Sequence, residues 1–462
     1  MADTPWLQDA CSLVDAYRAG ERDPVAETEA CLAAIEASEL NAFSHVDAER
    51  AIDAAKNADV GQPFGGVPMG VKELDKVAGW PDTEASLVFR DRVGDVNGTM
   101  VDRLVGAGAA LVGMCTASEF GGLNVSTTRL NGTTHNPWQH GKTAGGSSGG
   151  SSSAVAGGLV PIATGGDGGG SIRIPAAFNG LVGMKGTAGR IPRGPKTEIA
   201  PLTVVKGCQA RSVRDVARWY DVCAGYDMRD PYSLPSHGRW EAGLGTHDLK
   251  GMSVAVAPDL GRAVLRPEVE ANVREAADAL IADAGLVRKD VAVEFPGLGY
   301  AWAMSNLAQL ANDLVDVWPA CKDDLSKEIA FGLEMAHDAY DLAMAASVER
   351  NRTAMNEKMA AVFDDVDFLI CATNPDVAYP AEIMANTRVG DVKVGLENNG
   401  VLTIPANIVG NPSISVPVAP AFGLPVGMQI MTRHHDDALL LDLARIVEQT
   451  LPWPLVAPGA PC

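Results

Sequence analysis

The stretch from Lys142 to Ile174 constrains the fold of this chain more than any other. Two glycine-rich clusters each deliver a serine, Ser147 in the first and Ser171 in the second, and an apolar run of strand length separates them. Glycines permit tight turns and bring bare backbone N–H groups close to a ligand. A flexible Gly/Ser linker would carry neither the apolar run nor the Asp167 and Arg173 that flank the second serine. The stretch therefore predicts a catalytic surface rather than a linker.

Composition narrows the class of protein. The 462 residues, 47% of them hydrophobic, suffice for a large core. A net charge of −21 disfavours binding to nucleic acid or to an anionic membrane. The first residues lack the pattern of a secretory signal, and the longest charge-free run, 398–432, carries five prolines that are incompatible with a membrane helix. The cysteines and histidines are scattered, so we expect buried thiols in a reducing cytosol, with neither a disulfide framework nor a metal site.

Helical periodicity and short apolar runs alternate along the chain. Helices are predicted at 25–38, 46–58, 99–106, 267–284, 326–363 and 436–449, and another from the capping Ser212 onward. Strands are predicted at 67–71, 110–115, 252–257, 291–295, 368–371, 413–417 and 427–431. This alternation predicts the α/β class, with the charged stretch 326–363 as the most peripheral part.

The glycine-rich cluster around Ser147 can be compared with three known motifs, two that contain a serine nucleophile and one that binds phosphate. Gly145–Gly149 matches the G-x-S-x-G motif, which would make Ser147 the nucleophile of an α/β-hydrolase with His434 or His435 as its base. The segment 141–143 ends like a phosphate-binding loop but lacks the upstream glycine of that motif. No serine is followed three residues later by lysine, which excludes a penicillin-binding type of enzyme.

A fourth chemistry combines both serines with a lysine. A serine hydroxyl needs a base, and a desolvated lysine can serve because burial favours its neutral amine. Lys72 follows the predicted buried strand 67–71, although a lysine there is commonly a surface residue with a packed aliphatic stem. A second serine can relay the proton. Backbone N–H groups for an oxyanion hole would come from Gly168, Gly169 and Gly170.

Three motifs together resemble the amidase signature family: Gly66-Val-Pro-Met-Gly-Val-Lys72, Gly145–Gly150 and Gly166–Ala176. Further matches, such as Asn136-Pro-Trp and Gly423–Ile430, extend the resemblance over nearly the whole chain. It implies a single α/β/α domain over 1–462 around a large mixed, mostly parallel sheet. The signature core would span about 65–195, and a peripheral helical region about 300–365. Neither a metal nor an organic cofactor is implied.

The resemblance also implies residue roles. Ser171 becomes the nucleophile, Ser147 the bridging serine with a cis peptide bond, and Lys72 the base, so Ser147 is a relay and not a hydrolase nucleophile. Supporting roles fall to Ser148, Asp167 and Arg173. Substrate contacts are expected from the 118–136 segment, at Gly121, Gly122 and Leu123.

Two departures bear on the substrate. The family usually has threonine before the aspartate and a larger residue after it, where this chain has Gly166 and Gly168, so we expect a roomier or more mobile acyl pocket. The expected reaction is hydrolysis of a small-molecule amide, with carbamate (urethane) or ester bonds as further substrates. A cytoplasmic monomer or homodimer is expected, without nucleic acid or membrane partners. Three alternatives stay open: the glutaminase subunit of a tRNA-dependent amidotransferase, an α/β-hydrolase with a Ser-His-Asp triad, and a binding protein without activity.

Overall fold

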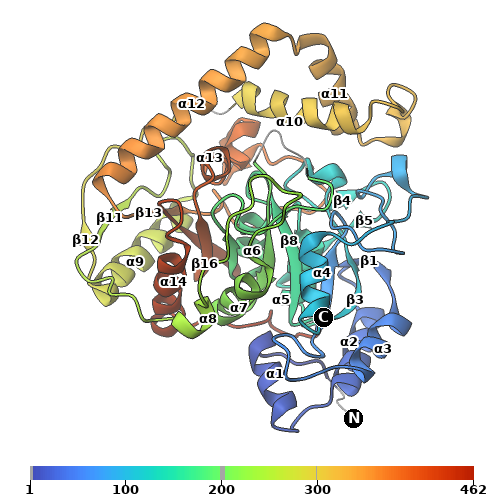
Figure 1. Cartoon of the computed structure of the whole chain (residues 1–462). Helices are drawn as coiled ribbons and strands as arrows, with labels where there is room; N and C mark the ends of the chain where they lie inside the picture. The colour runs from blue at the N-terminus through green and yellow to red at the C-terminus, as the bar shows by residue number, and fades with distance from the viewer. Residues whose placement is uncertain (1–3, 198–202, 298) are drawn as a thin grey trace.

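A large sheet runs through the computed structural model, which describes residues 4–197, 203–297 and 299–462 (Figure 1). Its first half has the strand order β1 (Phe43–Val46), β3 (Ala110–Cys115), β2 (Pro68–Lys72), β8 (Ile162–Asp167), β10 (Val205–Ala210). The second half has the order β12 (Val287–Arg288), β11 (Ser253–Val256), β13 (Phe368–Ala372), β17 (Leu424–Thr432), β16 (Ser413–Ala421), β9 (Gly183–Lys185). An antiparallel bridge between Val182 and Ala210 joins the two halves edge to edge.

Strand directions are mixed. β2 pairs in parallel with β3 and β8, and β11 with β12 and β13. The five other pairings that the structure describes in this sheet are antiparallel. The α/β class and the mixed sheet are confirmed. The sheet was expected to be mostly parallel, but antiparallel pairings outnumber parallel ones. One reason is the two-residue hairpin between β16 and β17, where Phe422 and Gly423 both have positive φ. A hairpin this short joins only antiparallel strands.

In β3 and β8, neighbouring residues alternate between two hydrophobic clusters. Leu111 and Ile162 belong to one cluster, and the next residues along the chain, Val112 and Ala163, belong to the other. Successive side chains of a strand point to opposite faces, so both faces of this half of the sheet are covered. The first cluster includes side chains of α1 (Ala10–Arg18), α4 (Thr99–Gly106), α7 (Val213–Cys223), α9 (Pro267–Ala284) and α14 (Asp437–Thr450). The second includes side chains of α3 (Ala48–Lys56), α5 (Gly149–Ala156) and α6 (Arg173–Asn179), with α2 (Pro24–Ala37) packed against it.

The expected long helix at 326–363 is two helices. α11 (Lys327–Ala339) ends before Asp341, whose side chain caps α12 (Leu342–Asp365) by accepting from the Met344 N–H. With α10 (Gly299–Asp313), α11 lies beyond the sheet at the top of Figure 1. The C-terminal half of α12 is not peripheral, because Met355 and Phe363 pack in the first hydrophobic cluster described above.

Two further differences concern strands. The segment 291–295, predicted as a strand, has no ladder partner in the described structure, although Val293 and Phe295 are buried. Apolar side chains can thus pack without a strand being formed. Conversely, β1 was missed, and α3 begins only at Ala48 because Asp47 caps it.

The remaining elements are short. They are η1 (Leu87–Phe89), η2 (Glu119–Gly121), α8 (Trp240–Gly243), η3 (Lys322–Asp324), η4 (Leu396–Asn399), α13 (Ile404–Val409), and the paired strands β4 (Thr127–Thr128) with β5 (Gly132–Thr133), β6 (His135–Asn136) with β7 (Gln139–Thr143), and β14 (Arg388–Val389) with β15 (Val392–Lys393). All eight cysteines are free thiols and seven are buried, as expected. Over the residues that the structure describes, no helix combines the length and the apolar character needed to cross a membrane.

Candidate active site

Lys72 is the last residue of β2, which lies between β3 and β8. Its side chain is buried rather than at the surface, with the residue 2% exposed. Nζ donates to Ser147 Oγ at 2.7 Å and to the Gly166 carbonyl at 3.1 Å. Burial lowers the pKa of Lys72 from its ordinary value to about 7. A substantial fraction of neutral amine is therefore present at neutral pH, in direct contact with a serine hydroxyl.

Ser147 lies in the turn between β7 and α5. The Gly146–Ser147 peptide bond is cis, as the resemblance implies. At Gly145, φ is +81° and a Cβ atom would come within 2.8 Å of Pro175 Cα, so glycine is needed for this turn to pass so close to α6. The glycine cluster is thus a packing requirement of the turn that presents Ser147 to Lys72.

Ser171 lies between β8 and α6 and is 6% exposed. Its carbonyl accepts from the Ser148 N–H at 3.3 Å, and the Ser148 hydroxyl lies 3.3 Å from both the N–H and the carbonyl of Gly166. Ser148 therefore ties the two serine turns together. Within the described residues, no hydrogen bond joins the hydroxyls of Ser171 and Ser147, so this conformation contains the lysine–serine contact but not a serine–serine one.

In the turn before Ser171, some backbone N–H groups already have a hydrogen-bond acceptor and others do not. The Gly170 N–H donates to Asp167 Oδ1 at 2.7 Å. In contrast to the prediction, Gly170 thus holds the turn and does not offer its N–H to an oxyanion. The N–H groups of Gly168, Gly169 and Ser171 have no acceptor in the part of the chain that the structure describes. These three N–H groups can therefore donate to a ligand oxygen.

Of the two glycines that depart from the family pattern, Gly168 faces Val204, because a Cβ atom there would lie 3.1 Å from Val204 Cγ2. A Cβ atom at Gly166 would meet only ordinary contacts, the nearest being the Val205 carbonyl oxygen at 3.7 Å. The neighbouring Gly169 lies against α10, where a Cβ atom would lie 3.0 Å from Trp302 Cζ2. Trp302 therefore forms an apolar wall directly beside the turn that precedes Ser171, and the roomier or more mobile pocket stays a prediction.

The predicted substrate-contact segment lies beside Ser147. A Cβ atom at Gly121 would lie 3.5 Å from Ser147 Oγ, and the Leu123 carbonyl packs against the turn before Ser147. Gly122 instead contacts α11, since a Cβ there would lie 2.8 Å from Ile329 Cδ1. The helical region is thus in contact with the signature core through Trp302 and Ile329.

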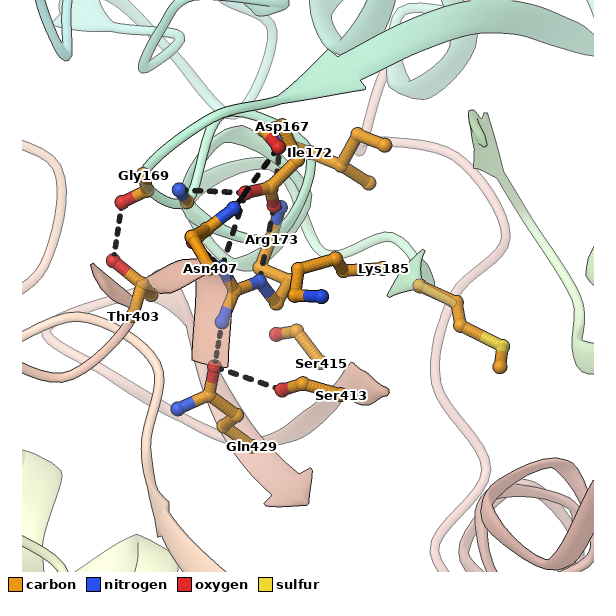
Figure 2. Close-up of polar contacts among 12 residues, drawn as sticks. Asp167, Gly169, Ile172, Arg173, Lys185, Thr403, Asn407, Ser413, Ser415 and Gln429 are labelled. Carbon is orange, nitrogen blue, oxygen red and sulfur yellow. Dashed lines mark hydrogen bonds and ion pairs between the residues drawn. The ribbon is translucent and has the colours of Figure 1, made fainter. Parts of the chain in front are cut away.

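Asp167 and Arg173 form a buried ion pair at the base of the turn (Figure 2). Arg173 Nε and Nη2 donate to the two carboxylate oxygens, each at 3.0 Å. Burial alone would raise the pKa of Asp167, but Arg173 and the Asn407 amide hold it below the ordinary value of a carboxyl group. The aspartate is therefore ionised and fixes the shape of the turn.

Three residues of this network were not predicted. Arg173 also donates to Gln429 Oε1 and Asn407 Oδ1, both at 2.6 Å, and Thr403 Oγ1 donates to the Gly169 carbonyl at 2.7 Å (Figure 2). One signal was available in the sequence. A glutamine inside the apolar strand 427–431 must find a polar partner once it is buried.

We expect Asp167→Asn to destabilise the fold by about 3–5 kcal/mol, because the buried Arg173 charge loses its compensating partner. Urea unfolding of the variant and the parent measures the difference. Glu270→Gln serves as a control, since it breaks only an exposed pair with Arg274 and should cost about 0.5 kcal/mol or less. A loss below about 1 kcal/mol in Asp167→Asn would show that the pair does not hold the turn.

The two histidines of the hydrolase alternative lie elsewhere. His434 Nε2 is 3.0 Å from the Val409 carbonyl, and His435 Nδ1 is 3.3 Å from Arg190 Nη2. Among the described residues, neither ring is hydrogen-bonded to Ser147 or Ser171. The G-x-S-x-G motif therefore has no histidine base here.

Fold and site together define an α/β protein with a buried lysine–serine pair beside a glycine-rich turn. The family model described as amidase matches residues 26–441. The acylamidase of Rhodococcus erythropolis is 32% identical over 90% of this chain and 89% of its own length. A glutamyl-tRNA(Gln) amidotransferase subunit of Chloroflexus aggregans is 31% identical over 95% of each chain. The solved structure of 6-aminohexanoate cyclic dimer hydrolase complexed with substrate superposes with a TM-score of 0.88, at 27% identity over 99% of each chain.

The chain therefore belongs to the amidase family, as its resemblance to the amidase signature enzymes implied.

Proposed function

We propose that this protein hydrolyses a carboxylic amide through an acyl-enzyme on Ser171. The observation that carries the proposal is the 2.7 Å contact between Lys72 Nζ and Ser147 Oγ, in a buried site beside the turn that holds Ser171. A serine becomes an effective nucleophile only when a base accepts its proton. The buried amine of Lys72 is that base, and in the proposed relay Ser147 passes the Ser171 proton to it once the two serine hydroxyls come into contact.

The proposed steps follow from this connection. Neutral Lys72 accepts the Ser147 proton while Ser147 accepts the Ser171 proton, and Ser171 Oγ attacks the carbonyl carbon. The oxyanion is stabilised by N–H groups at Gly168, Gly169 and Ser171, each donor being worth about 3 kcal/mol. The proton returns through Ser147 to the departing amine. Water then cleaves the acyl-enzyme by the same relay.

The substrate class is a small-molecule amide. The names of two relatives, an acylamidase and a 6-aminohexanoate cyclic dimer hydrolase, support amides as the first choice. The wall formed by Trp302 beside Gly169 favours an apolar or aromatic group next to the scissile carbonyl. Carbamate (urethane) and ester bonds present the same carbonyl to Ser171 and are proposed as further substrates. We further propose a cytoplasmic monomer or homodimer with a single amidase domain.

A second candidate is the glutaminase subunit of a tRNA-dependent amidotransferase. It is favoured by the 31% identity to the Chloroflexus aggregans amidotransferase subunit over 95% of each chain. Against it stands the net charge of −21, which provides no general attraction for tRNA.

The purified chain alone is expected to release product from aryl, fatty or peptide amides. The panel should include a carbamate and an ester, with glutamine as the competing substrate. Gel filtration of the same sample reports whether a partner protein is present. If glutamine is the single substrate that is hydrolysed, and if its hydrolysis requires added partner proteins, the glutaminase is favoured. No hydrolysis of any member would favour the binding protein without activity.

A further inference from the structure

A second lysine lies beside the proposed base. In the antiparallel pairing of β8 with β10, Lys206 is opposite Gly166, whose carbonyl accepts from Lys72 Nζ. A Cβ atom at Gly166 would lie 3.8 Å from Lys72 Nζ and 3.9 Å from Lys206 Cδ. Both lysine side chains therefore use the space over the bare α-carbon of Gly166. A branched side chain at position 166 would displace one of them.

Asp75 connects the two lysines. Its carboxylate accepts from Lys206 Nζ at 2.6 Å and from the Thr164 hydroxyl at 2.6 Å. The same Thr164 hydroxyl accepts from the Lys72 N–H at 2.7 Å, and the Asp75 N–H donates to the Lys72 carbonyl at 2.8 Å. Asp75 is 5% exposed. It therefore fixes both the main chain of Lys72 and the position of the Lys206 ammonium group.

Four charged groups act on Lys72 from the elements around it. Burial is the largest influence on the pKa of Lys72 and lowers it. Asp75 raises this pKa, Lys206 on β10 lowers it, and Asp167 on β8 and Glu84 raise it. Asp167 is neutralised by Arg173, and burial raises the pKa of Glu84 to about 7. Of these four groups, Asp75 and Lys206 therefore have the largest electrostatic effects on the pKa of Lys72, and their effects have opposite signs.

We propose that Asp75 and Lys206 are positioning residues that set the pH range in which Lys72 works as the base. Lys206, held by Asp75, opposes protonation of Lys72 through like-charge repulsion, while Asp75 favours it. The pair has a defined geometry because Thr164 and the sheet register hold Asp75 and Lys206 in place. This inference rests on the proposed function, in which Lys72 is the base.

Single charge removals should move the acid limb of the rate profile in opposite directions. Lys206→Met removes the repulsion, so Lys72 holds its proton to a higher pH and the limb moves up by about one pH unit. Asp75→Asn removes the attraction, so the limb moves down by a similar amount. The double variant should return towards the parent. Lys56→Met, which removes the same charge from an exposed helix position, should leave the limb in place.

The measurement is kcat/KM against pH for the parent and these four variants on one amide. A merely structural role would lower the rate at every pH without moving the limb, and that result would overturn the inference. Lys206→Met should regain nearly the parent rate well above the limb. If Asp75→Asn fails to fold, Lys206→Met alone decides, because an unmoved limb in that variant contradicts the proposal.

A titration without turnover separates this inference from the proposed function. NMR of lysine-labelled protein, with the Lys72 signal assigned by its loss in Lys72→Met, follows the protonation of Lys72 directly. We expect the midpoint to rise in Lys206→Met whether or not an active substrate is found. An unmoved midpoint in an active enzyme would overturn the role of the pair and leave the proposed function standing. A shifted midpoint in a protein that hydrolyses nothing would overturn the proposed function and leave only an electrostatic effect of the pair on Lys72.

Discussion

Ser171→Ala is expected to lower amide hydrolysis by more than about a thousandfold while the protein still folds. The loss follows because the variant has no oxygen that can form the acyl-enzyme. Folding should survive because the Ser171 contact that ties the two turns together is made by its main-chain carbonyl, which alanine retains. Initial rates on one aryl amide, with circular dichroism and urea unfolding of the same samples, measure both quantities.

Ser153→Ala is the matched control. Ser153 is a buried serine of α5, and its hydroxyl donates to the His135 carbonyl at 2.7 Å, outside the proposed relay. We expect this variant to keep most of the parent rate and to lose only about 1 kcal/mol of stability. If Ser171→Ala kept more than about a thousandth of the rate, another group would be the nucleophile.

Lys72→Ala is expected to lose about 10²- to 10⁴-fold in rate at neutral pH, the usual contribution of a general base. The reason is that the Ser147 hydroxyl then has no proton acceptor. His434→Ala and His435→Ala should be nearly silent, because their rings contact Val409 and Arg190 rather than the serines. If a histidine variant folds normally but loses its activity, while Lys72→Ala stays active, the α/β-hydrolase alternative would be restored.

The pH dependence of the parent enzyme has a definite sign. In the proposed mechanism neutral Lys72 is the working form, and burial lowers the pKa of Lys72 to about 7. The rate should therefore fall about tenfold per pH unit below that value and level off above it. Lys185 titrates in the same range, since burial and then Arg173 lower its pKa to about 7. The limb is thus assigned to Lys72 only if variants that act on Lys72 move it.

The sequence was sufficient for the parts of the site that depend on local turns. Lys72 could be placed at a strand end because the run 67–71 is apolar and bounded by glycine. The two serines could be placed because glycine clusters surround them. These are short-range patterns, and the structure has both turns and the buried lysine where the patterns put them.

The parts that were missed depend on packing between distant segments. Nothing near position 302 in the sequence indicates that Trp302 covers Gly169, because the contact arises only when α10 lies over the turn. The same holds for Asn407, which reaches Asp167 from α13. A glycine shows where a side chain is absent, but not which distant side chain takes its place.

The most direct test of the mechanism is to trap the nucleophile covalently. The protein is treated with an aryl fluorophosphonate, digested, and the modified peptide is located by mass spectrometry. The proposed relay predicts a phosphonyl group on Ser171 of the parent protein. We expect no adduct in Ser171→Ala, and only slow modification of Ser171 at neutral pH in Lys72→Ala. An adduct on Ser147 that persists in Ser171→Ala would contradict the assignment of nucleophile and bridge.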